Sequence, residues 1–268
     1  MSAKSDRKKI VLTGASGGIG SEIAKALANS GFDLILTGRS LEKLERVKES
    51  IPGDQHLSLS LDLTSESDLN KLKKSAYELD VDGLINCLGE NHLATLFQTD
   101  YSQINQMIQT NLVSPIGVCR VLAPIFRNKK TSFILNVGSI LGSIGYAGST
   151  VYCASKFGLR GFTESLRREL ADTGIRVIYI APRATKTALN SEAMDELNCK
   201  LGNAIDAPEY VAKKVLKAIS KTTSSTAYLG MPEAFYVRLN SIFPSIVDGA
   251  LSKKLSVIKQ YCQLNNAK

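Results

Sequence analysis

The sequence predicts a doubly wound α/β fold, in which a parallel sheet carries helices on both of its faces. Three observations support this prediction. Short apolar runs alternate with longer segments of helical periodicity over residues 9–229, which is typical of successive strand–helix–strand units. The runs are rich in Val, Ile and Leu, as expected for strands buried on both sides. A glycine-rich turn at 14–20 joins the first run to the first helical segment.

Seven strands and six helices are expected in order before residue 230. The strands are expected at 9–13, 33–37, 56–61, 82–86, 132–137, 175–181 and 226–229. The helices are expected at 19–30, 41–50, 66–79, 102–127, 151–172 and 208–220. Thr64 and Asp206 stand where helix caps are preferred, and Pro208 suits a first helical position. With no repeat or linker inside it, 8–230 is expected to form one domain, followed by a helical extension at 231–268.

Length, composition and cysteine spacing exclude several classes of protein. The 268 residues are 44% hydrophobic and 22% charged, which excludes a disordered chain, a collagen-like fibre and a disulfide mini-protein. The five cysteines show no metal or redox spacing, so we expect free thiols and no metal site. The chain shows no signal-peptide pattern and no stretch of ~20 apolar residues that could span a membrane. A cytoplasmic location is therefore expected.

The net charge of +8 lies mostly at the two ends of the chain. Residues 1–9 and 231–268 each carry a net charge of +3, so nucleic acid is not expected as a partner. The 231–268 extension has three interpretations. It packs on this chain or a sister subunit, it covers the substrate, or it makes a peripheral membrane contact. Its apolar side chains recur near helical spacing, at Phe235, Leu239, Ile242, Ile246 and Leu251.

The turn TGASGGIG at 13–20 predicts a dinucleotide-binding loop of a Rossmann fold. Gly14 allows a sharp turn, while Gly18 and Gly20 let the backbone approach a pyrophosphate and let the helix pack on the strand. The free N–H groups of the helix that follows favour phosphate binding. The spacing G-x-x-x-G-x-G differs from the common G-x-G-x-x-G. The position between a strand and a helix still favours a nicotinamide dinucleotide over an ordinary turn.

The ends of the next strands indicate how the cofactor is held. No carboxylate stands at 37–40 and Arg39 is available, which favours the 2′-phosphate of NADP(H) over NAD(H), although a solvated arginine is the alternative. Asp62 is expected either to accept from the adenine amino group or to cap the next helix. Asn86 and Gly89 follow the fourth strand and should border the cofactor, because ligands bind at the carboxyl ends of such strands.

Ser139, Tyr152 and Lys156 form the strongest constellation in the sequence. Ser139 ends the fifth strand, and the i, i+4 spacing of Tyr152 and Lys156 places them on one face of a helix. A nearby ammonium, and the positive nicotinamide ring in the oxidised complex, should lower the pKa of the phenol, so that the tyrosine exchanges a proton with a substrate oxygen. The chain has a second Y-x-x-x-K pair, Tyr210 and Lys214, with no serine thirteen residues upstream. We interpret that pair as a surface pair.

Several motifs occur in the order and spacing of the short-chain dehydrogenase/reductase family. They are TGASGGIG at 13–20, NCLG at 86–89, QTNLV around Asn111, NVGS at 136–139 and YCASK at 152–156. Over 8–230 the sequence resembles the single-domain branch, which includes 3-oxoacyl carrier-protein reductases and related carbonyl reductases. The resemblance implies a seven-stranded sheet in the order 3-2-1-4-5-6-7 and a homodimer or homotetramer.

The resemblance also implies roles for individual residues. The implied catalytic tetrad is Asn111, Ser139, Tyr152 and Lys156, with Lys156 on the nicotinamide ribose and Asn111 anchoring a relay water through its backbone. With those derived above, the expected cofactor-binding residues are Gly14, Ser16, Gly18, Ile19, Gly20, Arg39, Asp62, Asn86, Gly89, Tyr152, Lys156, Pro182 and Thr187. Val137 would flank the nicotinamide with Pro182.

Two positions depart from the family pattern. Leu88 replaces an alanine and would crowd the adenosine side. Arg183 replaces the glycine that usually follows Pro182, and it either faces an anionic substrate or is an exposed loop residue. The candidates to line the substrate cleft are His92, Ser143 and Tyr146, with loop or structural roles as their alternatives.

The combined pattern predicts an NADP(H)-dependent oxidoreductase that interconverts a carbonyl and an alcohol, with Tyr152 as general acid and base. The alternative is a non-catalytic NADP(H)-sensing or scaffolding protein, although a sensor has no need of the tyrosine. An epimerase or dehydratase of the longer branch is disfavoured by the glycine spacing. The substrate is expected to be a small molecule.

Overall fold

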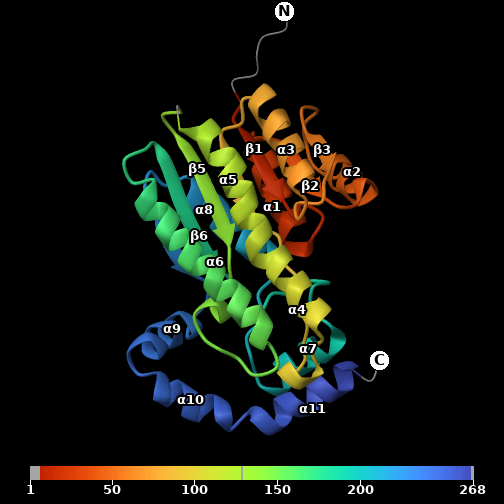
Figure 1. Cartoon of the computed structure of the whole chain (residues 1–268), viewed down its shortest axis with the longest axis vertical. Helices are drawn as coiled ribbons and strands as arrows, with labels where there is room; N and C mark the ends of the chain where they lie inside the picture. The colour runs from red at the N-terminus through yellow and green to blue at the C-terminus, as the bar shows by residue number, and fades with distance from the viewer. Residues whose placement is uncertain (1–6, 128, 267–268) are drawn as a thin grey trace, which may run out of the picture.

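The computed structural model describes residues 7–127 and 129–266. At its centre is a seven-stranded parallel sheet in the order β3-β2-β1-β4-β5-β6-β7, which confirms the expected fold and strand order. The strands are β1 (Lys9–Thr13), β2 (Asp33–Gly38), β3 (Leu57–Ser60), β4 (Gly83–Asn86), β5 (Ser132–Val137), β6 (Ile175–Ala181) and β7 (Ser225–Tyr228). Figure 1 shows helices on both faces of this sheet.

Eight helices precede the extension in the described part of the chain. They are α1 (Gly18–Asn29), α2 (Leu41–Glu49), α3 (Glu66–Glu78), α4 (Tyr101–Ile108), α5 (Ser114–Phe126), α6 (Thr150–Glu169), α7 (Glu192–Lys200) and α8 (Pro208–Ile219). The helix expected over 102–127 is continuous over 101–126, and a π-helical turn, Gln109–Val113, divides it into α4 and α5. The short helix α7, capped by Ser191, was not predicted.

The alternation of side chains along the strands builds two cores. Ile10 and Leu12 of β1 point to one face, where they pack with residues of α1 and α8 such as Leu27 and Val215. Val11 points to the other face and joins the cluster of α3 and α5. Burial on both faces explains why the strand sequences are almost continuously apolar.

A series of buried hydrogen bonds between polar side chains, called the polar chain below, links the strands near their carboxyl ends. The Thr13 hydroxyl donates to Asn86 Oδ1 at 3.3 Å, and Asn86 Nδ2 donates to Asn136 Oδ1 at 2.9 Å. Asn136 Nδ2 in turn donates to the Thr163 hydroxyl at 2.9 Å. These bonds run across β1, β4 and β5 to α6, and so fix the edge of the sheet at which ligands of this fold bind.

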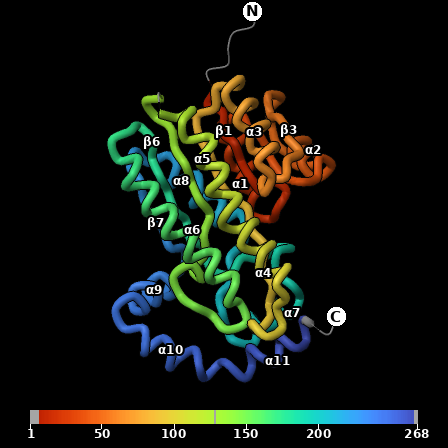
Figure 2. Tube along the Cα trace, in the orientation of Figure 1, coloured from red at the N-terminus to blue at the C-terminus, as the bar shows by residue number. Residues whose placement is uncertain are grey.

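The extension forms three helices, α9 (Glu233–Ile242), α10 (Pro244–Ser252) and α11 (Leu255–Asn266). Figure 2 shows them crossing the end of the molecule that lies below the sheet in this view. Val237 and Val247 pack with Ile144, in a cluster beside the end of β5. Further along, Ile258 and Cys262 pack with Leu93 and with α7. The extension therefore packs on the same chain, which is one of the interpretations left open by the sequence.

Among the described residues, no helix combines the length and the apolar character needed to cross a bilayer. The thiols of Cys87, Cys119, Cys153 and Cys199 are free, as the spacing of the cysteines indicates.

Candidate active site

The glycine loop between β1 and α1 is closely packed. Gly14 has a φ of +65°, and a Cβ there would lie 2.6 Å from the carbonyl oxygen of Cys87. A Cβ on Gly20 would lie 2.1 Å from the carbonyl oxygen of Gly14. A Cβ on Gly18 would lie 2.8 Å from Thr187 Cγ2, so the loop after β6 touches the glycine loop. Side chains are therefore excluded at all three positions, as the sequence predicted.

The surroundings of this loop fit the phosphates of a dinucleotide. No side chain caps the first turn of α1, so its N–H groups are free for an anion. Ser16 lies beside Gly38, with its hydroxyl 3.5 Å from the position of a Cβ there. Arg39 follows directly and is exposed. A serine hydroxyl and an available guanidinium at the end of β2 suit a phosphate on the adenosine ribose.

The structure gives different surroundings to three residues that the sequence predicts beside the cofactor, namely Asp62, Asn86 and Gly89. The Asp62 carboxylate accepts from the backbone N–H and the hydroxyl of Thr64, whereas Ser65 is the N-cap of α3. The capping interpretation of Asp62 is therefore wrong. The Asn86 side chain is buried in the polar chain between the strands, so only its backbone borders the turn. Gly89 lies beside Lys156, and a Cβ there would be 3.4 Å from Nζ.

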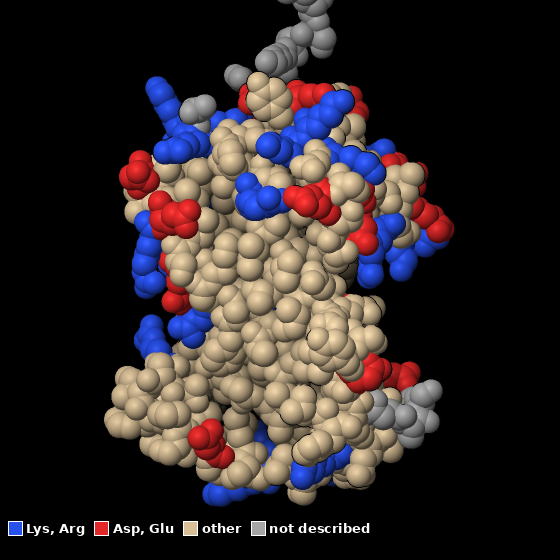
Figure 3. All heavy atoms as spheres, in the orientation of Figure 1, with Lys and Arg blue, Asp and Glu red and all other residues tan. Residues whose placement is uncertain are grey.

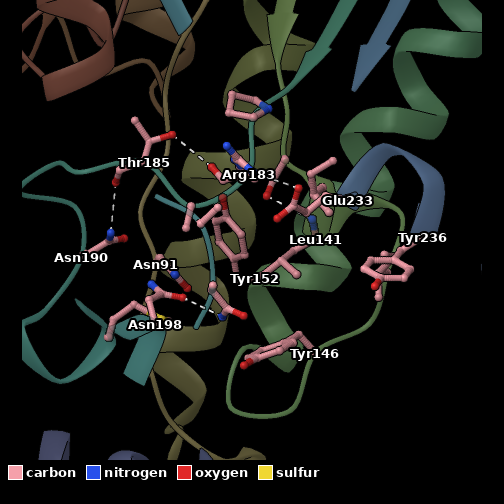
Figure 4. Close-up of a pocket in the computed structure, with 18 of the residues that line it drawn as sticks. Asn91, Leu141, Tyr146, Tyr152, Arg183, Thr185, Asn190, Asn198, Glu233 and Tyr236 are labelled. Atoms are coloured by element: carbon pink, nitrogen blue, oxygen red, sulfur yellow. Dashed lines mark hydrogen bonds and ion pairs between the residues drawn. The ribbon is translucent and has the colours of Figure 1, made fainter. Parts of the chain in front are cut away.

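Ser139, Tyr152 and Lys156 are brought together at the carboxyl end of β5. Lys156 Nζ lies 5.8 Å from the centre of the Tyr152 ring, and it donates to the carbonyls of Leu88 at 3.4 Å and Val137 at 3.5 Å. Figure 4 shows the Tyr152 side chain in the middle of the pocket. The i, i+4 spacing on α6 thus places the phenol and the ammonium on one face of the helix, as expected.

In the protein without a cofactor, burial shifts the pKa values of both Tyr152 and Lys156. Burial raises the pKa of Tyr152 to about 12, although a hydrogen bond with Ser139 acts in the opposite direction. Burial also lowers the pKa of Lys156 to about 8. The sequence argument predicted a lowered pKa of Tyr152 from the ammonium and from the nicotinamide ring of the oxidised complex. In the protein without cofactor the shift has the opposite direction, because desolvation of the phenolate outweighs the hydrogen bond with Ser139. Tyr152 is therefore a neutral phenol over the physiological pH range.

Asn111 lies in the π-helical turn and is fully buried. Its Oδ1 accepts from the backbone N–H of Glu90 at 2.8 Å, and its Nδ2 donates to the Glu90 carbonyl at 2.9 Å and to the Ser155 hydroxyl at 3.0 Å. The side chain therefore ties the turn after β4 to α6. Single π-turns in α-helices are frequent at functional sites, because they disturb the regular backbone hydrogen bonds.

Tyr179 is a supporting residue that the sequence analysis missed. This fully buried side chain of β6 lies beneath Ser139, whose backbone N–H donates to the Tyr179 hydroxyl at 3.4 Å. A Cβ on Gly138 would lie 2.1 Å from that hydroxyl, and one on Gly142 would lie 2.7 Å from it. Gly138 and Gly142 lie on either side of the turn that carries Ser139. Two glycines so close to that turn could have indicated that a large side chain packs against it.

A cavity of about 510 Å³ opens beside Tyr152. Of the residues predicted near the cofactor or substrate, those that line it are Ile19, Ser139, Tyr146, Tyr152, Pro182, Arg183 and Thr187. Ser143 instead contacts Arg160 and Tyr228 through its hydroxyl. His92 lines a smaller neighbouring cavity of about 260 Å³. The extension also lines the main cavity through α9 and α10, which the sequence did not establish.

Arg183 lines the cavity, as one of its two interpretations expects, and is not an exposed loop residue. Its guanidinium bonds Asp206 Oδ1 at 2.8 Å and Glu233 Oε2 at 3.1 Å, and its side chain is only 18% exposed. Two carboxylates of the chain therefore already hold the guanidinium. Figure 4 shows it beside Glu233 at one side of the pocket. The residue fastens the loop after β6 to the first helix of the extension.

The sequence of this chain matches a known protein family. The family model for short chain dehydrogenase matches residues 8–198. The chain belongs to the short-chain dehydrogenase family. As a member of this family it is an oxidoreductase that acts between carbonyl and alcohol groups and uses a nicotinamide dinucleotide.

Relatives within the short-chain dehydrogenase family cover most of the chain. Carbonyl reductase family member 4 of Xenopus laevis is 35% identical over 78% of this chain and 89% of its own length. A 3-oxoacyl-[acyl-carrier-protein] reductase of Bos taurus is 34% identical over 75% of this chain and 86% of its own. A short-chain dehydrogenase structure from Streptomyces avermitilis shares the fold, with a TM-score of 0.77 over 94% of this chain and 98% of that one, at 23% identity.

Proposed function

We propose that this protein is an NADP(H)-dependent oxidoreductase that interconverts a carbonyl and an alcohol, with Tyr152 as the general acid and base. One observation carries the proposal. The glycine loop meets the wall of the cavity that contains the Tyr152 phenol, with Ser139 beside it and Lys156 one helical turn away. The names of the carbonyl reductase and 3-oxoacyl reductase relatives support the same reaction class.

The chain's own residues supply the proton chemistry. A bound nicotinamide supplies or accepts the hydride. The neutral phenol of Tyr152 donates a proton to the carbonyl oxygen as the alcohol forms, and takes it back in the reverse direction. Ser139 orients the same oxygen through a hydrogen bond. The Lys156 ammonium stabilises the phenolate that remains after proton transfer, which offsets part of the cost of burying that charge.

Residues around the glycine loop would hold the cofactor. Gly14, Gly18 and Gly20 allow the tight turn between β1 and α1, with Thr187 packed against Gly18. The uncapped N–H groups at the start of α1 would bind the pyrophosphate. Arg39 would pair with the 2′-phosphate, since no carboxylate is present at the end of β2 to repel it. We therefore propose a preference for NADP(H) over NAD(H). The Asp62 carboxylate would accept a hydrogen bond from the adenine amino group.

We also propose that the protein is a homodimer or homotetramer in the cytoplasm, with 8–230 as the catalytic domain and 231–268 as its extension. Figure 3 shows few charged side chains over the middle of the face formed by α4, α5 and α6. Val113 of the π-helical turn and Phe157 of α6 are 43% and 42% exposed, and a second copy would cover them. Light scattering at micromolar concentration tests this proposal, and a monomer would contradict it.

The function is tested by measuring oxidation of NADPH and NADH over a panel of acyl, steroid, sugar and quinone carbonyls. We expect turnover of at least one class, with a higher kcat/KM for NADPH than for NADH. A clear preference for NADH would contradict the role given to Arg39. Tight NADPH binding without turnover of any carbonyl would favour a sensing or scaffolding protein.

A further inference from the structure

The cavity beside Tyr152 has two chemically different sides. Asparagines at 91, 190, 198 and 203 line one side, near α7. On the other side, the extension contributes the mostly apolar set Tyr236, Leu239, Ile246, Val247, Ala250 and Leu251, together with the charged Glu233 and Lys254. Figure 4 shows Asn91, Asn190 and Asn198 to one side of Tyr152, with Leu141 and Tyr236 to the other. A substrate whose carbonyl lies at Tyr152 therefore has an apolar wall on one side only.

The apolar side is enclosed by two parts of the chain. Ile140, Leu141 and Ile144 come from the turn after β5, which also carries Ser139. The extension faces this turn and packs against it through Val237 and Val247. The two segments are far apart in the sequence, so the apolar space exists only because α9 and α10 fold back on the catalytic turn.

An ion pair and two side-chain hydrogen bonds hold the extension in a fixed position beside the cavity. Arg183 bonds Glu233 at the start of α9, and Asn240 Nδ2 donates to the Ser143 carbonyl at 3.0 Å. At the far end, Asn265 Nδ2 donates to the Leu93 carbonyl at 3.0 Å. Arg183 also bonds Asp206, so the Glu233 carboxylate is fixed in an ion pair at the edge of the cavity.

We propose that the carbonyl substrate carries a large apolar body, as a long chain or fused rings, which lies between the turn after β5 and helices α9 and α10. This inference rests on the proposed function and adds its substrate class. Apolar lining favours an apolar ligand because both surfaces leave water on binding. The extension is thus a specificity-determining element, with Ile246 as one of its exposed contacts.

Two isoleucines of the extension provide a matched test. Ile246 lines the cavity and is 56% exposed, whereas Ile242 is 66% exposed and does not line it. Replacement of either by serine removes a similar exposed apolar side chain, so both variants should fold and melt like the parent. Only Ile246→Ser removes apolar contact from the proposed site.

The first experiment measures kcat/KM with NADPH for 2-butanone, 2-dodecanone and a fused-ring ketone such as 2-decalone. We expect one or both larger ketones to be favoured over 2-butanone by at least about tenfold. Ile246→Ser should lower kcat/KM for the favoured larger ketone by about tenfold and leave 2-butanone unchanged. Ile242→Ser should leave all three unchanged. Equal kcat/KM for all three ketones, or equal effects of the two variants, would overturn the proposal.

A second readout separates this inference from the proposed function. Decanamide resembles the apolar ketones but is not reduced, and its binding in the presence of NADP⁺ can be followed by calorimetry. We expect it to bind at least about tenfold more tightly than acetamide, and Ile246→Ser to remove most of the difference. If this holds while no ketone is reduced, the apolar site stands and the proposed reaction is wrong. If ketones are reduced without preference for size and decanamide binds no better than acetamide, the inference alone is wrong.

Discussion

The ammonium of Lys156 lies 5.8 Å from the centre of the Tyr152 ring, in a region where both side chains are buried. Two carbonyl oxygens, of Leu88 and Val137, are its hydrogen-bond acceptors at 3.4 and 3.5 Å. These long bonds replace water incompletely, which is why burial lowers the pKa of Lys156 to about 8. The protein therefore holds a costly charge where the proposed reaction needs one.

The buried ammonium should be visible in the pH dependence of stability. The Lys156 pKa falls from 10.5 in the unfolded chain to about 8 in the folded one. Between these values the unfolded state binds more protons, so the free energy of unfolding rises with pH. We expect the parent to gain up to about 3 kcal/mol relative to Lys156→Met between pH 8 and 10.5. Denaturant unfolding of both proteins across this range measures the difference.

A constant stability difference between parent and Lys156→Met across that range would contradict a lowered pKa. The comparison with the variant is needed because other groups titrate there as well. It isolates Lys156 from Tyr152, whose own raised pKa reduces stability above pH 10 in both proteins.

Arg39 should determine the choice of cofactor. Hydrogen bonds to a charged group contribute about 1.5–3 kcal/mol, so Arg39→Ala should weaken NADPH binding by at least about tenfold. NADH binding should stay the same, since that cofactor lacks the 2′-phosphate. Arg46→Ala on α2 is the control, because Arg46 is also exposed but is paired with Glu42. Equal weakening of NADPH and NADH by Arg39→Ala would show that the guanidinium does not contact that phosphate.

Gly148 is where the extension meets the start of α6. It has a φ of +75°, and a Cβ there would lie 2.9 Å from Cys262 Sγ of α11. Gly148→Ala should therefore lower the free energy of unfolding by about 1–3 kcal/mol. Gly249→Ala should raise it by about 0.5–1 kcal/mol, because Gly249 is helical and has open space around it. Urea unfolding of both variants tests the pair, and a neutral Gly148→Ala would mean that α11 does not pack there.

Local patterns made much of the fold and of the candidate site predictable from the sequence. The strands could be placed because burial on both faces makes runs such as 9–13 almost wholly apolar. The glycine loop could be identified because Gly14 and Gly20 occupy positions where the backbone itself fills the space of a Cβ. The Tyr152–Lys156 pair could be placed because helix geometry alone brings residues four apart to one face.

Other features depend on contacts that no local pattern reveals. The partners of Arg183, Asp206 and Glu233, lie 23 and 50 residues away in the chain, so its role could not be predicted from the loop. The direction of the Tyr152 pKa depends on how completely the fold buries the phenol. The apolar side of the cavity also requires knowing where α9 and α10 come to lie.

The most direct test of the central claim is the effect of Tyr152→Phe on the reduction of a good ketone substrate by NADPH. Removal of the phenolic proton should lower kcat by about 10²–10⁴-fold, while the Kd for NADPH stays within about twofold of the parent. Tyr210→Phe is the matched control, because Lys214 lies 5.0 Å from the Tyr210 ring in a similar pair on α8. We predict that the control keeps the parental rate. A parental rate in Tyr152→Phe would contradict the account.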